Sequence, residues 1–164
     1  MKSSRLKLER AVGRRQRGVA AIEFALVFGV LFLGIYGLVT FCGVLYVQQV
    51  ISRAAEDGAR AAQSFRSDTP AADLQTNVRT AVYRSLALSM ITPASVGAAP
   101  SSKEDWLREK MAGIPPEVTV SLGEVAVKVT YPYRANPLLP PVPLTGSWMP
   151  EQLLGKATAA RSSS

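Results

Sequence analysis

The stretch RRQRGVAAIEFALVFGVLFLGIYGLVTFCGVLYV, residues 14–47, decides the architecture of this chain. The basic residues end just before Gly18, and the 24 residues from Phe24 to Val47 carry no charge. At ~1.5 Å per residue, a helix of that length spans ~36 Å, more than the ~30 Å hydrocarbon core of a bilayer. The pattern therefore predicts one membrane-spanning helix. The lone acid, Glu23, lies at its edge, where leaving it unpaired in lipid would cost about 2.5–3.5 kcal/mol.

The positive charge is concentrated before this run. Residues 1–18 hold seven basic residues and one acid, whereas the rest of the chain holds 12 basic and 11 acidic residues. Because positive flanks stay in the cytoplasm, we expect a single-pass inner-membrane protein with its N-terminus inside and its C-terminal domain periplasmic. The near-neutral remainder argues against nucleic-acid binding. The apolar run is too long for an ordinary secretory signal, so the leader is either an uncleaved signal anchor or is cut before the run.

The residue inventory excludes several kinds of chemistry. The chain has no histidine and a single cysteine, Cys42, so we expect no histidine-based triad or metal site and no intramolecular disulfide. Cys42 is interpreted as a small apolar helix residue, with a bridge between packed helices as the alternative. Gly-rich phosphate loops and metal clusters are absent from the sequence, so we expect neither a cofactor nor an enzymatic activity.

Residues 19–66 are expected to form one continuous helix. Four glycines interrupt its apolar part, and they are either ordinary membrane-helix glycines or a packing groove for partner subunits: Gly29, Gly34, Gly37 and Gly43. After the span, apolar residues recur at the helical period at positions 47, 50, 51, 54, 55, 58, 61 and 62. This face must pack on the chain's own domain or on a neighbouring subunit.

The C-terminal domain, residues 67–164, is expected to be α+β. Thr69 is a candidate N-cap and Pro70 a candidate first residue of a helix that reaches about Met90. Residues 92–103 are expected to be a loop, and a short helix is expected over 104–111.

Residues 117–133 predict an antiparallel hairpin. A type II′ turn at Gly123-Glu124 would place Leu122 opposite Val125, Val120 opposite Val127 and Val118 opposite Val129, all on one face. The six prolines of residues 132–150 exclude a helix or central strand there, and Trp148 suggests that the segment lies against the domain. A last strand is expected around residues 153–159.

The run Arg17-Gly18-Val19-Ala20-Ala21-Ile22-Glu23-Phe24-Ala25-Leu26-Val27 resembles the TadE-like proteins of tight-adherence (Flp-type) pilus assembly. The resemblance covers residues 14 to about 62. In that family a membrane aspartyl peptidase cuts after a glycine, and a glutamate lies five residues into the mature chain. The resemblance thus implies cleavage between Gly18 and Val19. It also implies an assembly role for Glu23 and the adjoining Phe24, in which Glu23 meets the terminal amine of a neighbouring subunit.

Together these features predict a basic prepilin-type leader (1–18), a membrane helix with a periplasmic extension (19–66) and a small pilin-like α+β head (67–164). The resemblance implies a pseudopilin or minor pilin that takes part in adhesive pilus assembly. Its partners would be the membrane, a prepilin peptidase, and other pilin and Tad assembly subunits. The alternative is an uncleaved, signal-anchored scaffold or adaptor of an envelope secretion complex.

Overall fold

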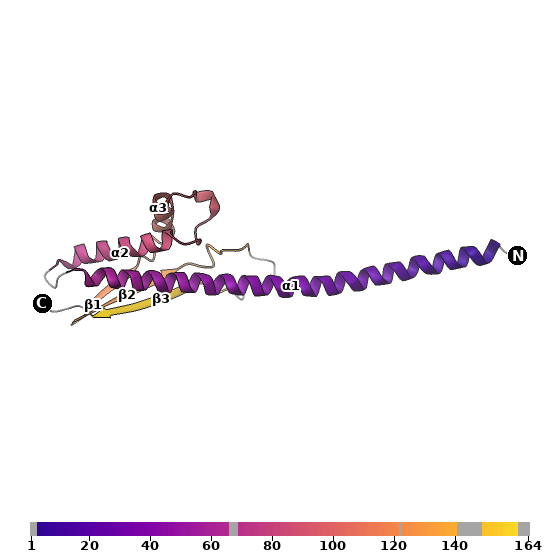
Figure 1. Ribbon diagram of the computed structural model, residues 1–164, viewed down its shortest axis with the longest axis horizontal. Helices are drawn as coiled ribbons and strands as arrows, with labels where there is room; N and C mark the ends of the chain where they lie inside the picture. Colours follow the sequence, from indigo (N-terminus) through magenta and orange to yellow (C-terminus); the bar gives the residue numbers. More distant parts are fainter. Residues whose placement is uncertain (1–2, 66–68, 122, 141–148, 161–164) are drawn as a thin grey trace. The chain divides into compact units, whose positions relative to one another are not determined.

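The computed structural model describes residues 3–65, 69–121, 123–140 and 149–160. It contains one long helix followed by a small domain with a three-stranded antiparallel sheet, which confirms the α+β prediction. The chain divides into two compact units, Met1–Cys42 and Gly43–Ser164. The elements are α1 (Ser3–Gln63), α2 (Ala71–Ala87), η1 (Ala94–Val96), α3 (Pro100–Lys110), β1 (Glu117–Ser121), β2 (Glu124–Tyr131) and β3 (Leu153–Ala160) (Figure 1).

Helix α1 begins at Ser3, well before Val19, where the sequence places its start. No proline occurs in α1, and its apolar part is followed by alanine-rich sequence that favours helix. It ends at Gln63, where the backbone N–H groups of Ser64 and Phe65 donate to the carbonyls three residues back, at Ala61 and Ala62.

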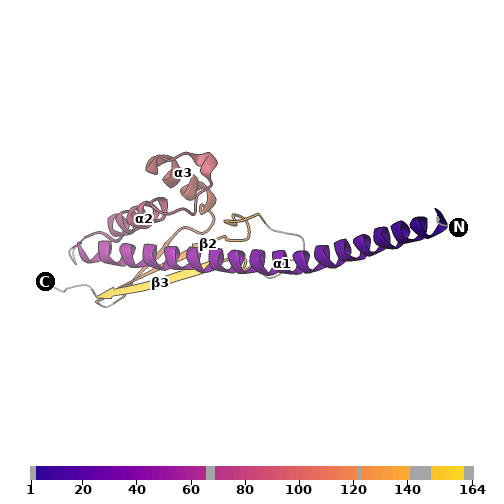
Figure 2. The ribbon, with the colours of Figure 1, turned by 45° about the vertical axis from the view of Figure 1, so that its right-hand side comes forward.

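Within the Gly43–Ser164 unit, the C-terminal part of α1 is a middle layer, with α2 on one side and the sheet on the other (Figures 1 and 2). A Cβ added at Gly58 would lie 2.6 Å from Val82 of α2 and 3.3 Å from Val127 of β2. The apolar face after the span therefore packs on the chain's own domain. Its buried members in α1 are Val47, Ile51, Ala54, Ala55, Ala59 and Ala62.

The sheet approaches α1 even more closely at Gly155 of β3. A Cβ there would lie 2.7 Å from the backbone oxygen of Ile51. The amide of Gln48, also on α1, donates to the Leu154 carbonyl at 2.7 Å. The absence of a side chain at Gly155 thus allows the backbone of β3 to contact the backbone of α1.

The boundaries of α2 and α3 differ from those predicted. Pro70 precedes α2, whose first residue is Ala71, so Thr69 is not its N-cap. The Pro70 carbonyl instead accepts the N–H of Leu74. Helix α3 starts at Pro100, inside the stretch predicted to be a loop, because proline fits the first turn of a helix, where no internal N–H bond is lost.

The strand order is β1-β2-β3, with both pairs antiparallel. The hairpin and the last strand are confirmed, but the predicted hairpin register is wrong by two residues. Val120 pairs with Val125, and Val118 pairs with Val127. Because Ser121 pairs with Glu124, the connection is not the predicted Gly123-Glu124, and Leu122, which was predicted to face Val125, lies outside the described residues. Gly123 has a φ of +80°, a conformation that glycine adopts readily.

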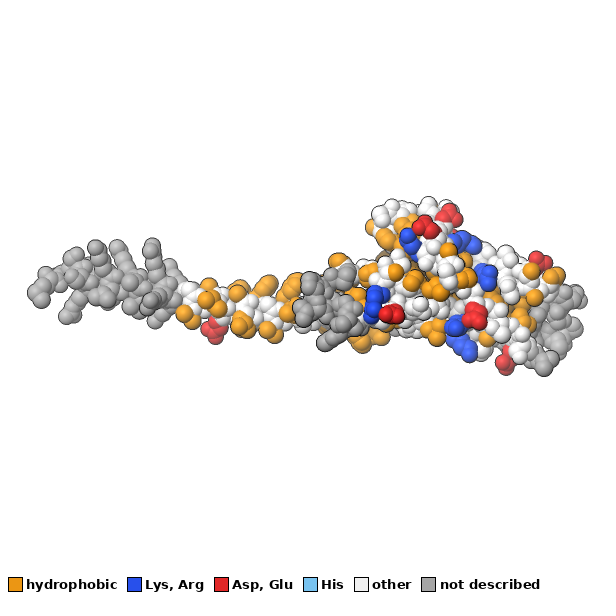
Figure 3. Space-filling view, turned by 180° about the vertical axis from the view of Figure 1, so that it is seen from behind, with side chains coloured by type: hydrophobic (Ala, Val, Ile, Leu, Met, Phe, Trp, Pro, Cys, Tyr) orange, Lys and Arg blue, Asp and Glu red, His pale blue; other side chains and the backbone are white. Residues whose placement is uncertain are grey.

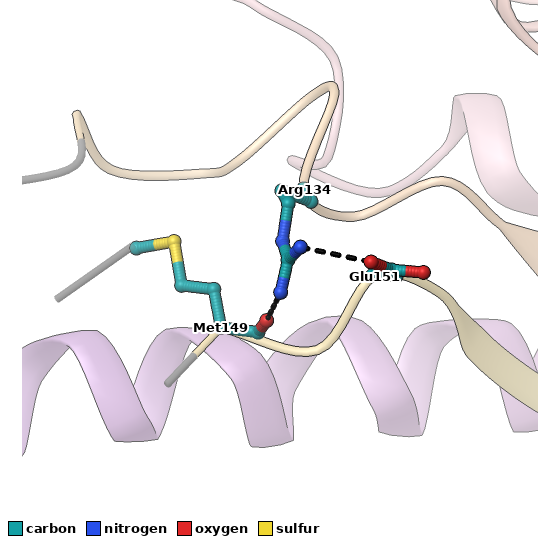
Figure 4. Close-up of polar contacts among 3 residues, drawn as sticks. All are labelled: Arg134, Met149 and Glu151. Carbon is teal, nitrogen blue, oxygen red and sulfur yellow. Dashed lines mark hydrogen bonds and ion pairs between the residues drawn. The ribbon is translucent and has the colours of Figure 1, made fainter. Parts of the chain in front are cut away.

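The two ends of the segment between β2 and β3 are joined to each other through Arg134. Arg134 donates through Nη1 to Glu151 Oε1 at 2.9 Å and through Nη2 to the Met149 carbonyl at 2.8 Å (Figure 4). The N–H of Arg134 also donates to the Glu151 carbonyl, at 3.2 Å. Arg134 thus holds residue 134 close to residues 149–151. Trp148 lies outside the described residues.

Candidate functional site

The Gly18–Val19 bond lies inside α1 rather than in an extended segment. A Cβ added at Gly18 would have nothing within 4 Å, and 66% of Val19 is exposed. Any protease that requires an extended substrate must therefore unwind α1 at this point. Glycine makes that easier, since it lowers helix stability by about 1 kcal/mol relative to alanine.

Glu23 lies just over one helical turn beyond Val19, and its side chain is exposed. Its neighbours Ile22 and Phe24 are each 70% exposed. In the part of the chain that the structure describes, no side chain pairs with this carboxylate. It is therefore available to a partner outside this chain.

An aromatic ladder follows from Phe24, and the sequence analysis did not identify it. Phe24, Phe28, Phe32 and Tyr36 recur every four residues along one side of α1. Their successive ring centroids are 6.0, 6.4 and 6.3 Å apart. The signal was available in the sequence, since residues at i and i+4 meet on a helix surface.

The four glycines singled out in the span have two kinds of surroundings. A Cβ added at Gly29, Gly34 or Gly37 would meet nothing within 4 Å. A Cβ at Gly43 would lie 3.8 Å from Leu138, 3.9 Å from Leu139 and 4.0 Å from Tyr133. The first three glycines are therefore open to neighbours, whereas Gly43 packs against the chain's own domain.

The described part of α1 from Gly18 onward meets the length and composition expected of a membrane span, and its most apolar window is not buried within the chain. Hydrophobic side chains dominate this part of the helix, where one red acidic group also projects, whereas blue and red charged groups are spread over the larger unit (Figure 3). Cys42, the last residue of the Met1–Cys42 unit, is an exposed free thiol. One apolar helix of this kind fits a single-pass membrane protein.

The larger unit shows the features of a packed domain. Tyr131 and Tyr133 are each 1% exposed, so these two aromatic residues belong to the core. Burial raises the pKa of Tyr131 to about 12, with a smaller contribution from Tyr133. Burial also raises the pKa of Tyr83, against the opposing charges of Arg108 and Arg79.

The described residues contain no group of three or more His, Cys, Asp or Glu side chains that could hold a metal ion. The acids of the head are spread over its surface, and several of them pair with nearby cations. Glu104 is 3.9 Å from Arg108, and Glu117 is 3.3 Å from Lys128. These pairs are solvent-exposed and contribute little to stability.

Comparison with known proteins identifies the N-terminal segment. Residues 18–60 match the family model described as TadE-like protein. The matched segment runs from Gly18 through Glu23 and the span to the part of α1 that forms the middle layer of the head. Neither a curated protein nor a solved structure matches the chain.

Proposed function

We propose that this chain, with its TadE-like segment at residues 18–60, is a pseudopilin or minor pilin that takes part in building an adhesive tight-adherence pilus. The match itself supports a relation to Tad pilus assembly and to the membrane. The finer role rests on one observation, which is that Gly18, Val19 and Glu23 lie within α1 directly before its exposed, charge-free apolar part.

In this proposal a prepilin peptidase cuts between Gly18 and Val19 at the cytoplasmic face of the inner membrane. The cut removes residues 1–18 and leaves an amine on Val19. It also frees the first N–H groups of the shortened helix, and that end then favours a nearby negative charge by about 0.3–1 kcal/mol.

Glu23 then becomes the fifth residue of the mature chain. The carboxylate pairs with the Val19 amine of a neighbouring subunit and so sets the axial register of assembly. Leaving one member of a buried ion pair without its partner costs about 3–5 kcal/mol, so a subunit out of register is disfavoured. Gly29, Gly34 and Gly37 give the neighbouring helices room to approach. The protein has no catalytic step of its own, and it requires no cofactor.

Intact mass of the membrane-extracted protein tests the processing step. In cells that contain the peptidase we expect loss of residues 1–18, and in cells without it the full chain. Gly18→Val should block maturation, because the added side chain restricts close approach of the peptidase backbone, and it should leave membrane insertion intact.

The matched control is Gly29→Val, which makes the same change at another open position on the same helix. This variant should mature normally. Normal maturation of Gly18→Val would place the cut elsewhere. A full-length mass in every strain would instead support the uncleaved scaffold or adaptor, a role with which the uninterrupted course of α1 through Gly18 is compatible.

A further inference from the structure

Among the described residues of the head, Leu88 and Met90 are the most exposed large apolar side chains. Leu88 is 74% exposed and Met90 is 79% exposed, and both lie in the turn that follows α2. Tyr46 and Leu138, each 37% exposed, belong to the same unit. We call these four residues the Tyr46 rim.

Contacts within the head connect this turn to the first residues of α1 in the unit. The backbone N–H of Met90 donates to the hydroxyl of Tyr46 at 3.2 Å. Leu88 and Tyr46 line one surface hollow, while Met90 and Leu138 line another. Leu138 also lies 3.8 Å from the Cβ position of Gly43. The rim is therefore level with residues 43–46 of α1.

Helix length gives the depth of these residues. Phe24 to Gly43 is a run of 20 residues, and at ~1.5 Å per residue it covers the ~30 Å of a hydrocarbon core. The charge-free run continues to Val47, so its last four residues extend beyond the core. The head unit begins at Gly43. Tyr46 thus falls in the layer where hydrocarbon meets headgroups.

The side chains beside the rim suit this layer. A cavity of about 740 Å³ adjoins Met90 and Leu138, and its lining includes Trp106 and Lys103. Tryptophan and tyrosine concentrate at membrane interfaces, and lysine reaches the headgroups with its ammonium group while its stem stays apolar. Exposed apolar side chains flanked by such residues are typical of surfaces that rest in a lipid interface.

We propose that the Tyr46 rim is a lipid-contact surface, through which the head lies partly in the outer headgroup layer of the membrane that α1 crosses. The inference rests on the membrane-spanning part of the proposed function and requires neither cleavage nor pilus assembly. The rim then restricts the tilt of the head over the bilayer, because Leu88 and Met90 leave lipid if the head rotates away.

Fluorescence quenching in proteoliposomes tests this contact on the full chain. In a Cys42→Ser background, Met90→Cys carries an environment-sensitive fluorophore, and the lipids carry a nitroxide near the top of the acyl chain. The matched control is Glu124→Cys, because Glu124 pairs with Ala160, whose carbonyl accepts a hydrogen bond from Gln63. Gln63 is 17 residues beyond Tyr46 on α1, a distance of ~25 Å along the helix.

At low protein-to-lipid ratio, we expect the label at position 90 to lose most of its fluorescence and the label at position 124 to keep it. Leu88→Asp should reduce the quenching at position 90 while the protein stays in the alkali-washed membrane. Equal quenching at the two positions in a protein that resists alkaline extraction overturns the proposal. Quenching that appears only when copies are crowded would make the rim a protein interface and would also overturn it. Extraction of the protein by alkali would instead contradict the membrane-spanning premise.

Discussion

Glu23 is the only carboxylate between Gly18 and Val47, so replacing it isolates the contribution of that charge. We expect Glu23→Ala to accumulate in the membrane, since removing a charge from the edge of the span does not hinder insertion. It should support few or no pili, because in the proposed assembly the Val19 amine of a neighbour would lose its partner. Glu23→Gln, which keeps the shape without the charge, should be intermediate at best.

Pilus counts for these variants must be compared at matched protein level, because a destabilised protein would give the same phenotype. Wild-type pilus numbers in Glu23→Ala would reduce this acid to a surface charge that reaches the interface. They would also favour the uncleaved anchor over the pilin.

Tyr131 predicts how the head responds to alkali. Its pKa is about 12 in the folded chain, above the ~10 of an exposed tyrosine, because burial disfavours the phenolate. Its contribution to stability is complete below about pH 10 and is lost as the pH rises toward about 12. A pKa raised this far corresponds to a stability difference of roughly 3 kcal/mol across that range.

We therefore expect Tyr131→Phe to lose less stability than the wild type between about pH 10 and 12. Near neutral pH the stability of the variant should be close to that of the wild type. The hydroxyl that it lacks donates only a long hydrogen bond, 3.4 Å, from Tyr131 to the Asn136 carbonyl. Urea unfolding of the detergent-solubilised chain at the two pH values measures the difference. An equal loss in both proteins would show that other groups control the alkaline transition.

Among elements, the contact of α1 with the sheet is the most sensitive to added volume. Gly155→Ala places a Cβ 2.7 Å from the Ile51 backbone oxygen, so strand and helix must separate. We expect a loss of about 2–3 kcal/mol. Gly58→Ala should cost less, because the nearest atom is a Val82 methyl group, which can move, and because alanine favours helix by about 1 kcal/mol.

The control for both is Gly113→Ala, where the new methyl group would meet nothing within 4 Å. Its effect should stay within about 0.5 kcal/mol. Thermal unfolding of the three variants should rank Gly155→Ala as the least stable and Gly113→Ala as the most stable. A Gly155→Ala protein as stable as the Gly113→Ala control would mean that β3 does not pack on α1 at backbone distance.

For the hairpin, the sequence predicted which face is apolar but not the pairing register of the two strands. Alternation of valines identified one face of the hairpin, and on that face Val118, Val125, Val127 and Val129 are buried whereas Val120 is 42% exposed. A register error of two residues leaves every side chain on the same side. The register itself depends on which two residues connect the strands. Gly123 was assigned to the first turn position, but it occupies the second, and a single glycine in the sequence fits either position.

The packing of α1 was only partly visible in the sequence. The helical period of small residues after Val47 predicted a buried face, but not that α2 and the sheet would enclose it from two sides. Gly58 is the residue at which α2 and the sheet both approach α1. In the alanine-rich part of α1 after Val47, the single glycine indicates close approach of another element, but it does not say which element approaches.

At the scale of the whole molecule, the positive charge of residues 1–18 predicts the orientation of the chain in the membrane. Residues 1–18 carry a net charge of +6, whereas the stretch after the span, residues 48–66, holds three arginines against two acids. The N-terminus should therefore stay in the cytoplasm. A reporter that is active only in the periplasm should be active when fused after Ser164, and a paired cytoplasmic reporter should be silent. The reverse pattern would invert the topology.

The middle-layer position of α1 also sets the order in which the head can form. Residues 47–62 are synthesised before either of the layers that cover them, and the Gln48–Leu154 bond joins residues 106 positions apart. The side of α1 that packs on β3 must therefore remain uncovered until the ribosome has completed that strand, even after α2 has been synthesised. Premature termination before Leu153 would leave the alanine face of α1 exposed and prone to aggregation, so the last strand acts as the closing step of biogenesis.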